Sequence, residues 1–200
     1  MKRICVYCGS SPGKNENYRV AAHQLGKEFV KSDIGLVYGG GSVGLMGIIA
    51  DEVMQNGGEV IGVIPRDLDF REVSNRSLSD LHVVENMHER KALMAELADG
   101  FIAMPGGYGT LDEMFEILTW SQLGLHEKPV GLLNVNGFYN RLLEYLDHVV
   151  EEQFIEPVFR TLILSSAEPQ ELLEQMSRFA HPKADKAKMA LAKKFDQNKP

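Results

Sequence analysis

The fold is decided near the amino terminus, by the stretch Ile4-Cys5-Val6-Tyr7-Cys8-Gly9-Ser10-Ser11-Pro12-Gly13. Its first half is a short apolar run with β-branched and aromatic residues, which is typical of a buried strand. Its second half is a glycine-containing loop, and a segment of helical period begins soon after it, at Tyr18. A buried strand, a loop and a helix in this order predict the first unit of a parallel sheet.

The same alternation continues along the chain. We expect strands at Arg3–Cys8, Leu36–Tyr38, Val60–Ile64, Leu81–Val84, Phe101–Met104, Val130–Asn134 and Leu162–Leu164. We expect helices at Tyr18–Ser32, Leu45–Asn56, Met87–Ala98, Thr110–Leu123, Tyr139–Glu152 and Pro169–Phe179. This pattern predicts an α/β fold of one domain, with a Rossmann-like, doubly wound, mostly parallel sheet flanked by helices.

Composition narrows the class of protein. With 200 residues, 44 % apolar and 24 % charged, the chain has an ordinary globular composition. Its net charge of −7 disfavours nucleic acid as a partner, because phosphate backbones would be repelled. No apolar run approaches the roughly 18 residues that cross a bilayer, and the run after Arg3 is too short for a signal peptide. We therefore expect a cytoplasmic protein with no membrane partner.

The chain end differs from the rest. Residues 180–200 carry six lysines against two aspartates and have no strand signal. We expect a domain over residues 1–180 and a lysine-rich tail over residues 181–200. A solvated terminal segment is favoured over a docking site for an acidic partner.

The two cysteines have C-x-x-C spacing, at Cys5 and Cys8. On a strand, side chains three residues apart point to opposite faces, so these sulfurs cannot readily share a metal or form a disulfide. We expect both thiols to be buried and structural. The histidines show no metal-ligand spacing with each other or with a cysteine, so no metal site is predicted.

Three of the loops that follow strands are rich in glycine: residues 9–13, 39–47 and 105–110. Each leads into a helix, whose first N–H groups and positive dipole end can hold an anion, and glycine lets that anion approach the backbone. Tight turns alone explain any single loop, but the three together favour phosphate binding. Candidate phosphate contacts outside the third loop are Gly9, Ser10, Gly40, Gly41 and Ser42.

The second loop also allows a dinucleotide interpretation. Gly39, Gly41 and Gly44 satisfy G-x-G-x-x-G after a strand. The next strand ends without the acid that would bind a free ribose, although Arg66 at its end suits the 2′-phosphate of NADP. An NADP-binding oxidoreductase therefore stays as an alternative of low weight.

Charged residues cluster at two helix starts. A charged tetrad, His88-Glu89-Arg90-Lys91, falls in the first turn of a predicted helix, where cations are unfavourable unless an anion compensates them. An ordinary surface helix of mixed charge explains this tetrad equally well. Glu113 follows the third glycine loop, within reach of a phosphate ester held there. The run Thr110-Leu111-Asp112-Glu113 is equally consistent with a capping box, in which the glutamate turns back to the helix start. Spacing alone does not separate these two roles of Glu113.

Together these residues resemble a known family. Met87-His88-Glu89-Arg90-Lys91, followed by Pro105-Gly106-Gly107-Tyr108-Gly109-Thr110-Leu111-Asp112-Glu113, is similar to the paired signature of the LOG (Lonely Guy) phosphoribohydrolases, long labelled lysine decarboxylases. Further matches are Tyr38-Gly39-Gly40-Gly41 and Trp120-Ser121-Gln122-Leu123-Gly124, and the resemblance spans roughly residues 4 to 156. Asp112 departs from the Glu-Glu pair common in relatives, but keeps the charge.

The resemblance implies hydrolysis of the N-glycosidic bond of nucleoside 5′-monophosphates to base and ribose 5-phosphate, without a cofactor, by a protein that is usually a homodimer in short forms. It implies Arg90 and Glu113 as the catalytic pair. It implies the following substrate contacts: Glu72, Lys91, Gly106, Gly107, Tyr108, Gly109, Thr110, Asp112 and Thr119. A non-catalytic nucleotide carrier with the same loops is the other alternative.

Overall fold

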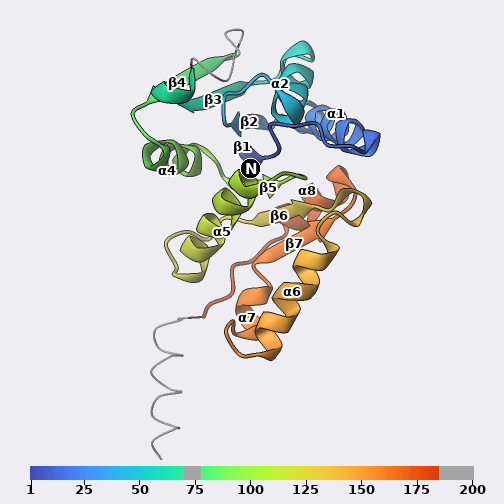
Figure 1. Ribbon diagram of the computed structural model, residues 1–200, viewed down its shortest axis with the longest axis vertical. Coiled ribbons are helices and arrows are strands. Elements are labelled where there is room, and N and C mark those ends of the chain that lie inside the picture. Colours follow the sequence, from blue (N-terminus) through green and yellow to red (C-terminus); the bar gives the residue numbers. More distant parts are fainter. Residues whose placement is uncertain (70–77, 185–200) are drawn as a thin grey trace, which may run out of the picture.

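The computed structural model describes residues 1–69 and 78–184 and contains a seven-stranded sheet with helices on both faces (Figure 1). The strand order is β4-β3-β2-β1-β5-β6-β7, and every recorded pair of neighbours is parallel. The strands are β1 (Arg3–Tyr7), β2 (Gly35–Tyr38), β3 (Val60–Pro65), β4 (Asp80–Val84), β5 (Gly100–Ala103), β6 (Val130–Leu133) and β7 (Ile163–Ser166). This confirms the predicted doubly wound α/β fold.

The helices alternate with the strands. They are α1 (Glu16–Lys31), α2 (Gly44–Gln55), α3 (Arg66–Asp69), α4 (Met87–Leu97), α5 (Tyr108–Gln122), α6 (Asn140–Glu151), α7 (Pro157–Arg160) and α8 (Pro169–Ser177), with a 3₁₀ turn η1 (Val135–Gly137). All seven predicted strands and all six predicted helices are present. The short α3, α7 and η1 were not predicted, because three or four residues are too few to show a helical period.

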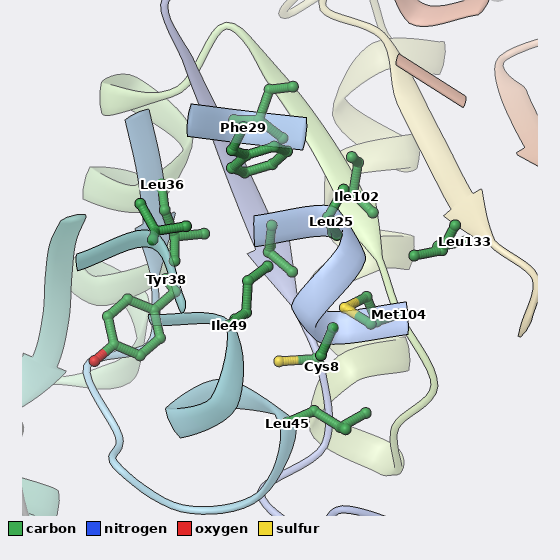
Figure 2. Packing of buried hydrophobic residues seen from close by; sticks show 14 of the residues in the cluster. Cys8, Leu25, Phe29, Leu36, Tyr38, Leu45, Ile49, Ile102, Met104 and Leu133 are labelled. Atoms are coloured by element: carbon green, nitrogen blue, oxygen red, sulfur yellow. The ribbon is translucent and has the colours of Figure 1, made fainter. Parts of the chain in front are cut away.

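The core lies in two layers, one on each face of the sheet. One layer joins β1 and β2 to α1, α2 and α8, and includes Phe29, Tyr38 and Ile49 (Figure 2). The other joins the strands to α4 and α5, and includes Met94 and Met114. Cys8 lies in the first layer and Cys5 in the second, both as buried free thiols, which confirms the prediction that they point to opposite faces.

The strand order places one pair of loops side by side. From β1 the chain proceeds through β2 and β3 to β4 on one side, and then returns to β5 on the other side of β1. In open parallel sheets ligands bind where the direction of winding reverses, beyond the carboxyl ends of the strands. Here the reversal lies between the loops after β1 and β5, and the Gly9 N–H donates to the Pro105 carbonyl across it at 3.1 Å.

The described part of the carboxyl-terminal segment returns to α5. His181 Nε2 lies 3.1 Å from the Ser121 hydroxyl, and Phe179 and Ala184 pack against the second core layer. Over residues 1–69 and 78–184, none of the helices combines the length and the apolar character that a membrane span requires.

Candidate active site

A hollow of about 240 Å³ opens at the reversal point, bounded by the loops after β1 and β5 and by α4 and α5. Its charged side chains are Arg90, Asp112 and Glu113. Its remaining lining residues are Cys8, Gly9, Ser10, Met46, Met87, Gly107, Tyr108, Gly109 and Thr110. The topology thus brings together two sequence motifs that lie on different helices.

Helix α5 begins two residues earlier than predicted. Its N-cap is Gly107, no side chain caps it, and Thr110 lies within the first turn with its hydroxyl packed against Gly106. Of the two interpretations of Glu113, the capping box with Thr110 is therefore not the one that the structure contains. With Tyr108 as its first residue, the helix carries Glu113 past its opening turn and into the wall of the hollow.

Side-chain capping does occur at the start of α4, where Asn86 is the N-cap. The Asn86 side chain accepts from the Glu89 N–H at 2.9 Å, which satisfies an amide that the first turn of a helix leaves free. The Glu89 carboxylate accepts from the Glu85 N–H at 3.0 Å and so ties the residue before the N-cap to the helix. These contacts fix the start of α4, and the residue that follows Glu89 is Arg90.

The first turn of α5 is open toward the hollow. A Cβ added at Gly107 or at Gly109 would meet no atom within 4 Å, and neither glycine has a positive φ. Packing against the described protein atoms therefore explains neither glycine, and for Gly109 a positive φ does not explain it either. They leave the unpaired N–H groups at the helix start accessible to an anion. Tyr108 between them is 95 % exposed.

Other glycines of the predicted phosphate loops serve the packing of the protein itself. A Cβ at Gly44 would overlap the backbone of Ser10, and a Cβ at Gly47 would overlap the backbone of Ser42. Gly40 has a φ of 77° and packs against Ile64. Gly9 and Ser10 line the hollow, whereas Gly40, Gly41 and Ser42 do not.

Arg90 is a buried cation with few partners. The residue is 7 % exposed. Its Nη2 donates to the Gly39 carbonyl at 3.2 Å, its Nη1 lies 3.6 Å from the Met87 sulfur, and its Nε has no partner among the described residues. A buried donor without a partner is unfavourable in the free protein, so this guanidinium is suited to an additional acceptor from a ligand.

Glu113 faces this cation. Its Oε1 lies 4.0 Å from Arg90 Nη2, and its side chain is 11 % exposed. Burial raises the pKa of Glu113 to about 7, against the opposing effect of the Arg90 charge. The carboxyl therefore titrates near neutral pH, which is typical of groups at functional sites.

The side chain of Lys91 points to α5 and forms ion pairs with two acids of that helix. Its Nζ lies 3.2 Å from Asp112 and 3.0 Å from Glu116. Burial lowers the pKa of Lys91, but the hydrogen bonds and charges of these two acids outweigh it and leave the pKa raised. The anions that compensate the first-turn cations of α4 are therefore supplied at least partly by α5.

Two predicted site residues fall elsewhere. Thr119 donates to the Phe115 carbonyl and lines a separate apolar hollow that shares no residue with the first. Glu72 lies outside the described residues. Arg66, the candidate for an NADP phosphate, pairs with Glu85 at 2.7 Å.

Sequence reasoning missed several lining residues. Met46, Met87 and Cys8 form walls of the hollow, and Gly39 contacts Arg90 from a strand end 51 residues away. Met87 stands next to the recognised charged tetrad and offered some signal. Gly39 belongs to the second glycine loop, but nothing in the sequence pairs it with Arg90. Met46 and Cys8 offered only ordinary core character. Within the described residues, no group of three or more His, Cys, Asp or Glu is arranged to hold a metal ion.

The fold is that of a Rossmann-like α/β protein, and its hollow lies at the reversal point of the sheet, where ligands bind in open parallel sheets. A family model described as "Possible lysine decarboxylase" matches residues 46–176. A cytokinin riboside 5′-monophosphate phosphoribohydrolase of Arabidopsis thaliana is 53 % identical over 178 residues, 89 % of this chain and 82 % of that one. A probable enzyme of the same name from Oryza sativa subsp. japonica is 53 % identical over 185 residues, 92 % of this chain and 74 % of that one. The chain belongs to this family, the LOG phosphoribohydrolases.

Solved structures of more distant proteins share the fold. A molybdenum cofactor carrier protein from Chlamydomonas reinhardtii superposes with a TM-score of 0.66 at 22 % identity, covering 88 % of this chain and 95 % of its own. A molybdenum cofactor binding protein from Rippkaea orientalis gives a TM-score of 0.67 at 21 % identity, covering 88 % and 96 %.

Proposed function

We propose that the protein hydrolyses the N-glycosidic bond of nucleoside 5′-monophosphates, including cytokinin riboside 5′-monophosphates and AMP, to free base and ribose 5-phosphate. The observation that carries the proposal is the position of Glu113 and Arg90 in one hollow with the open first turn of α5. The names of the relatives, which are more than half identical to this chain, support the same reaction.

The 5′-phosphate binds at the first turn of α5, where Gly107 and Gly109 leave the amides uncovered. Glu113 is the sixth residue of this helix, so the ribose of a phosphate-anchored nucleotide lies between the anchor and the carboxylate. Binding energy from the phosphate then orients the scissile bond, which is remote from the phosphate itself.

Cleavage of the bond between C1′ and nitrogen develops positive charge on the ribose. An ionised Glu113 stabilises this charge, and the same carboxylate can orient the attacking water. Arg90 remains a cation, so its role is to bind the substrate and to favour the ionised form of Glu113, as the direction of its effect on the Glu113 pKa requires.

The remaining assignments are also proposals. Tyr108, Thr110 and Asp112 contact the substrate from the first part of α5, and Gly106 does so from the loop before it. Lys91 acts with Asp112. Glu72 contributes a further contact. Thr119, which lies in a different hollow of the same chain, is supported only by the family motif. Residues 1–180 form the catalytic domain, and residues 181–200 the tail.

We also propose a cytoplasmic homodimer. The basis of this proposal is the family resemblance, because apolar residues of the motif helices such as Met94, Met114 and Leu118 are buried within one chain. Exposed apolar side chains remain at Leu123, Leu125 and Phe154. Light scattering at micromolar concentration should give twice the chain mass, and a monomer mass would refute the proposal.

The function is tested by incubating the purified protein with AMP, isopentenyladenosine monophosphate and adenosine, followed by chromatography for the free base. Release from the monophosphates with little release from adenosine is expected, because the nucleoside lacks the anchor. Equal rates on adenosine and AMP would contradict the proposed anchor. Binding of AMP without release of base would favour a carrier.

A further inference from the structure

We propose that Gly39 is a positioning residue, which fixes the guanidinium of Arg90 in the hollow by supplying both its hydrogen-bond acceptor and the space it occupies. The part of this inference that concerns rates rests on the proposed hydrolysis. The part that concerns packing does not.

The acceptor is the first observation. Among the described residues, the Arg90 guanidinium has one oxygen acceptor within hydrogen-bond distance, the Gly39 carbonyl at 3.2 Å. The Met87 sulfur is a weak acceptor, and the Glu113 carboxylate is 4.0 Å away. The carbonyl at the end of β2 therefore holds the buried cation in place.

The second observation concerns the space beside the Cα atom of Gly39. A Cβ at Gly39 would overlap Nη2 of Arg90 and would lie 3.1 Å from Cζ. The sulfur of Met46 would be its next neighbour, at 3.5 Å. The guanidinium therefore packs directly on the Cα atom of Gly39, in the volume that any other side chain would fill.

Backbone conformation does not explain the glycine. Gly39 is not among the residues with positive φ, whereas the following Gly40 has a φ of 77°. Other residues can adopt the backbone at position 39 but not at position 40 without strain. The structural reason for glycine at position 39 is therefore the side chain of Arg90, 51 residues later in the chain.

Replacing Gly39 by alanine should move the guanidinium by more than an ångström, because the far end of a flexible side chain yields before the backbone does. A misplacement of about 1 Å at a catalytic centre can cost about 100-fold in rate, so kcat/KM for AMP should fall by about this factor. Since Arg90 lowers the pKa of Glu113, its displacement should also move the acid limb of the pH profile to higher pH.

The decisive experiment is a double-mutant cycle of Gly39→Ala and Arg90→Ala, read by melting temperature and by hydrolysis of AMP. In the native background Gly39→Ala should lower Tm. In the Arg90→Ala background, where the guanidinium no longer occupies the space beside Gly39, the same change should lower Tm much less. If Gly39→Ala alone does not fold, the double variant should still fold.

Gly100→Ala is the matched control. Its added Cβ would touch the ends of the Met176 and Met1 side chains at 3.0 and 3.1 Å and the Pro129 ring at 3.2 Å, at the amino-terminal end of β5 and away from the hollow. It should leave the rate and the pH profile unchanged. Equal effects of Gly39→Ala on Tm in both backgrounds, or an unchanged kcat/KM in Gly39→Ala, would overturn the proposal. Absence of hydrolysis by the native protein would overturn the proposed function but leave the Tm cycle as a valid test.

Discussion

The Arg90 guanidinium lies 4.0 Å from the Glu113 carboxylate, with both side chains nearly buried. This separation is too long for a hydrogen bond but short enough for the two charges to affect each other. Within residues 1–69 and 78–184 the separation leaves the lone pairs of the carboxylate free of this guanidinium and available to a third group, while the arginine limits how far burial raises the pKa of Glu113.

Glu113→Gln should reduce turnover of AMP by about 100-fold or more, because the amide cannot supply negative charge to a ribosyl cation. AMP binding should persist, since the phosphate anchor is untouched. Single-turnover hydrolysis and calorimetric titration with AMP measure the two quantities. Turnover within a few-fold of the native protein would instead direct the search for the catalytic carboxylate to Asp112 or Glu72.

The same variant should not be destabilised, because Glu113 is not a capping residue. The pKa of Glu113 is raised from 4.5 to about 7 in the folded protein, so its contribution to stability is fully present below pH 4.5 and is lost as the pH rises through 7. Between pH 4.5 and 7 the melting temperature of the native protein should therefore fall relative to that of Glu113→Gln. A difference that is independent of pH would contradict the raised pKa.

The pH dependence of kcat/KM reports the same group. If the ionised carboxylate is the active form, kcat/KM for AMP should rise with pH and level off above about 7, the pKa of Glu113. Rates measured from pH 5 to 9 in buffers of constant ionic strength test this. A rate that decreases through pH 7 would show that Glu113 acts in its protonated form.

Substitution of Lys91 and substitution of Asp112 should shift the acid limb of the pH profile of kcat/KM in opposite directions. The charge of Asp112 raises the pKa of Glu113 and the charge of Lys91 lowers it. Asp112→Asn should therefore move the acid limb to lower pH, and Lys91→Met should move it to higher pH. If the main role of either residue is direct substrate contact, KM for AMP will change while the limb stays in place.

Gly109→Ala should separate stability from binding. Alanine is favoured over glycine in a helix by up to about 1 kcal/mol, and no atom lies within 4 Å of the added Cβ, so Tm should stay or rise. The methyl group would stand where the phosphate approaches, and KM for AMP should increase by about tenfold or more. An unchanged KM would show that the phosphate binds elsewhere. Gly100→Ala is again the control and should leave KM unchanged.

The amino-acid sequence by itself determined the order of strands and helices, because the apolar period of each segment is a local property. It also located the loops and the motif pairs, since residues that follow parallel strands meet at one edge of the sheet. It could not decide between two roles of Glu113, because a capping box and a catalytic carboxylate share the same spacing.

Only the tertiary structure removed the capping alternative, by beginning α5 at Tyr108 rather than at Thr110. It also separated the glycines that face open space, such as Gly109, from those that pack on the protein, such as Gly44. The contact of Gly39 with Arg90 and the raised pKa of Glu113 depend on burial and on neighbours distant in the chain. Such proximity arises when the sheet brings separate segments together, and no local pattern of residues encodes it.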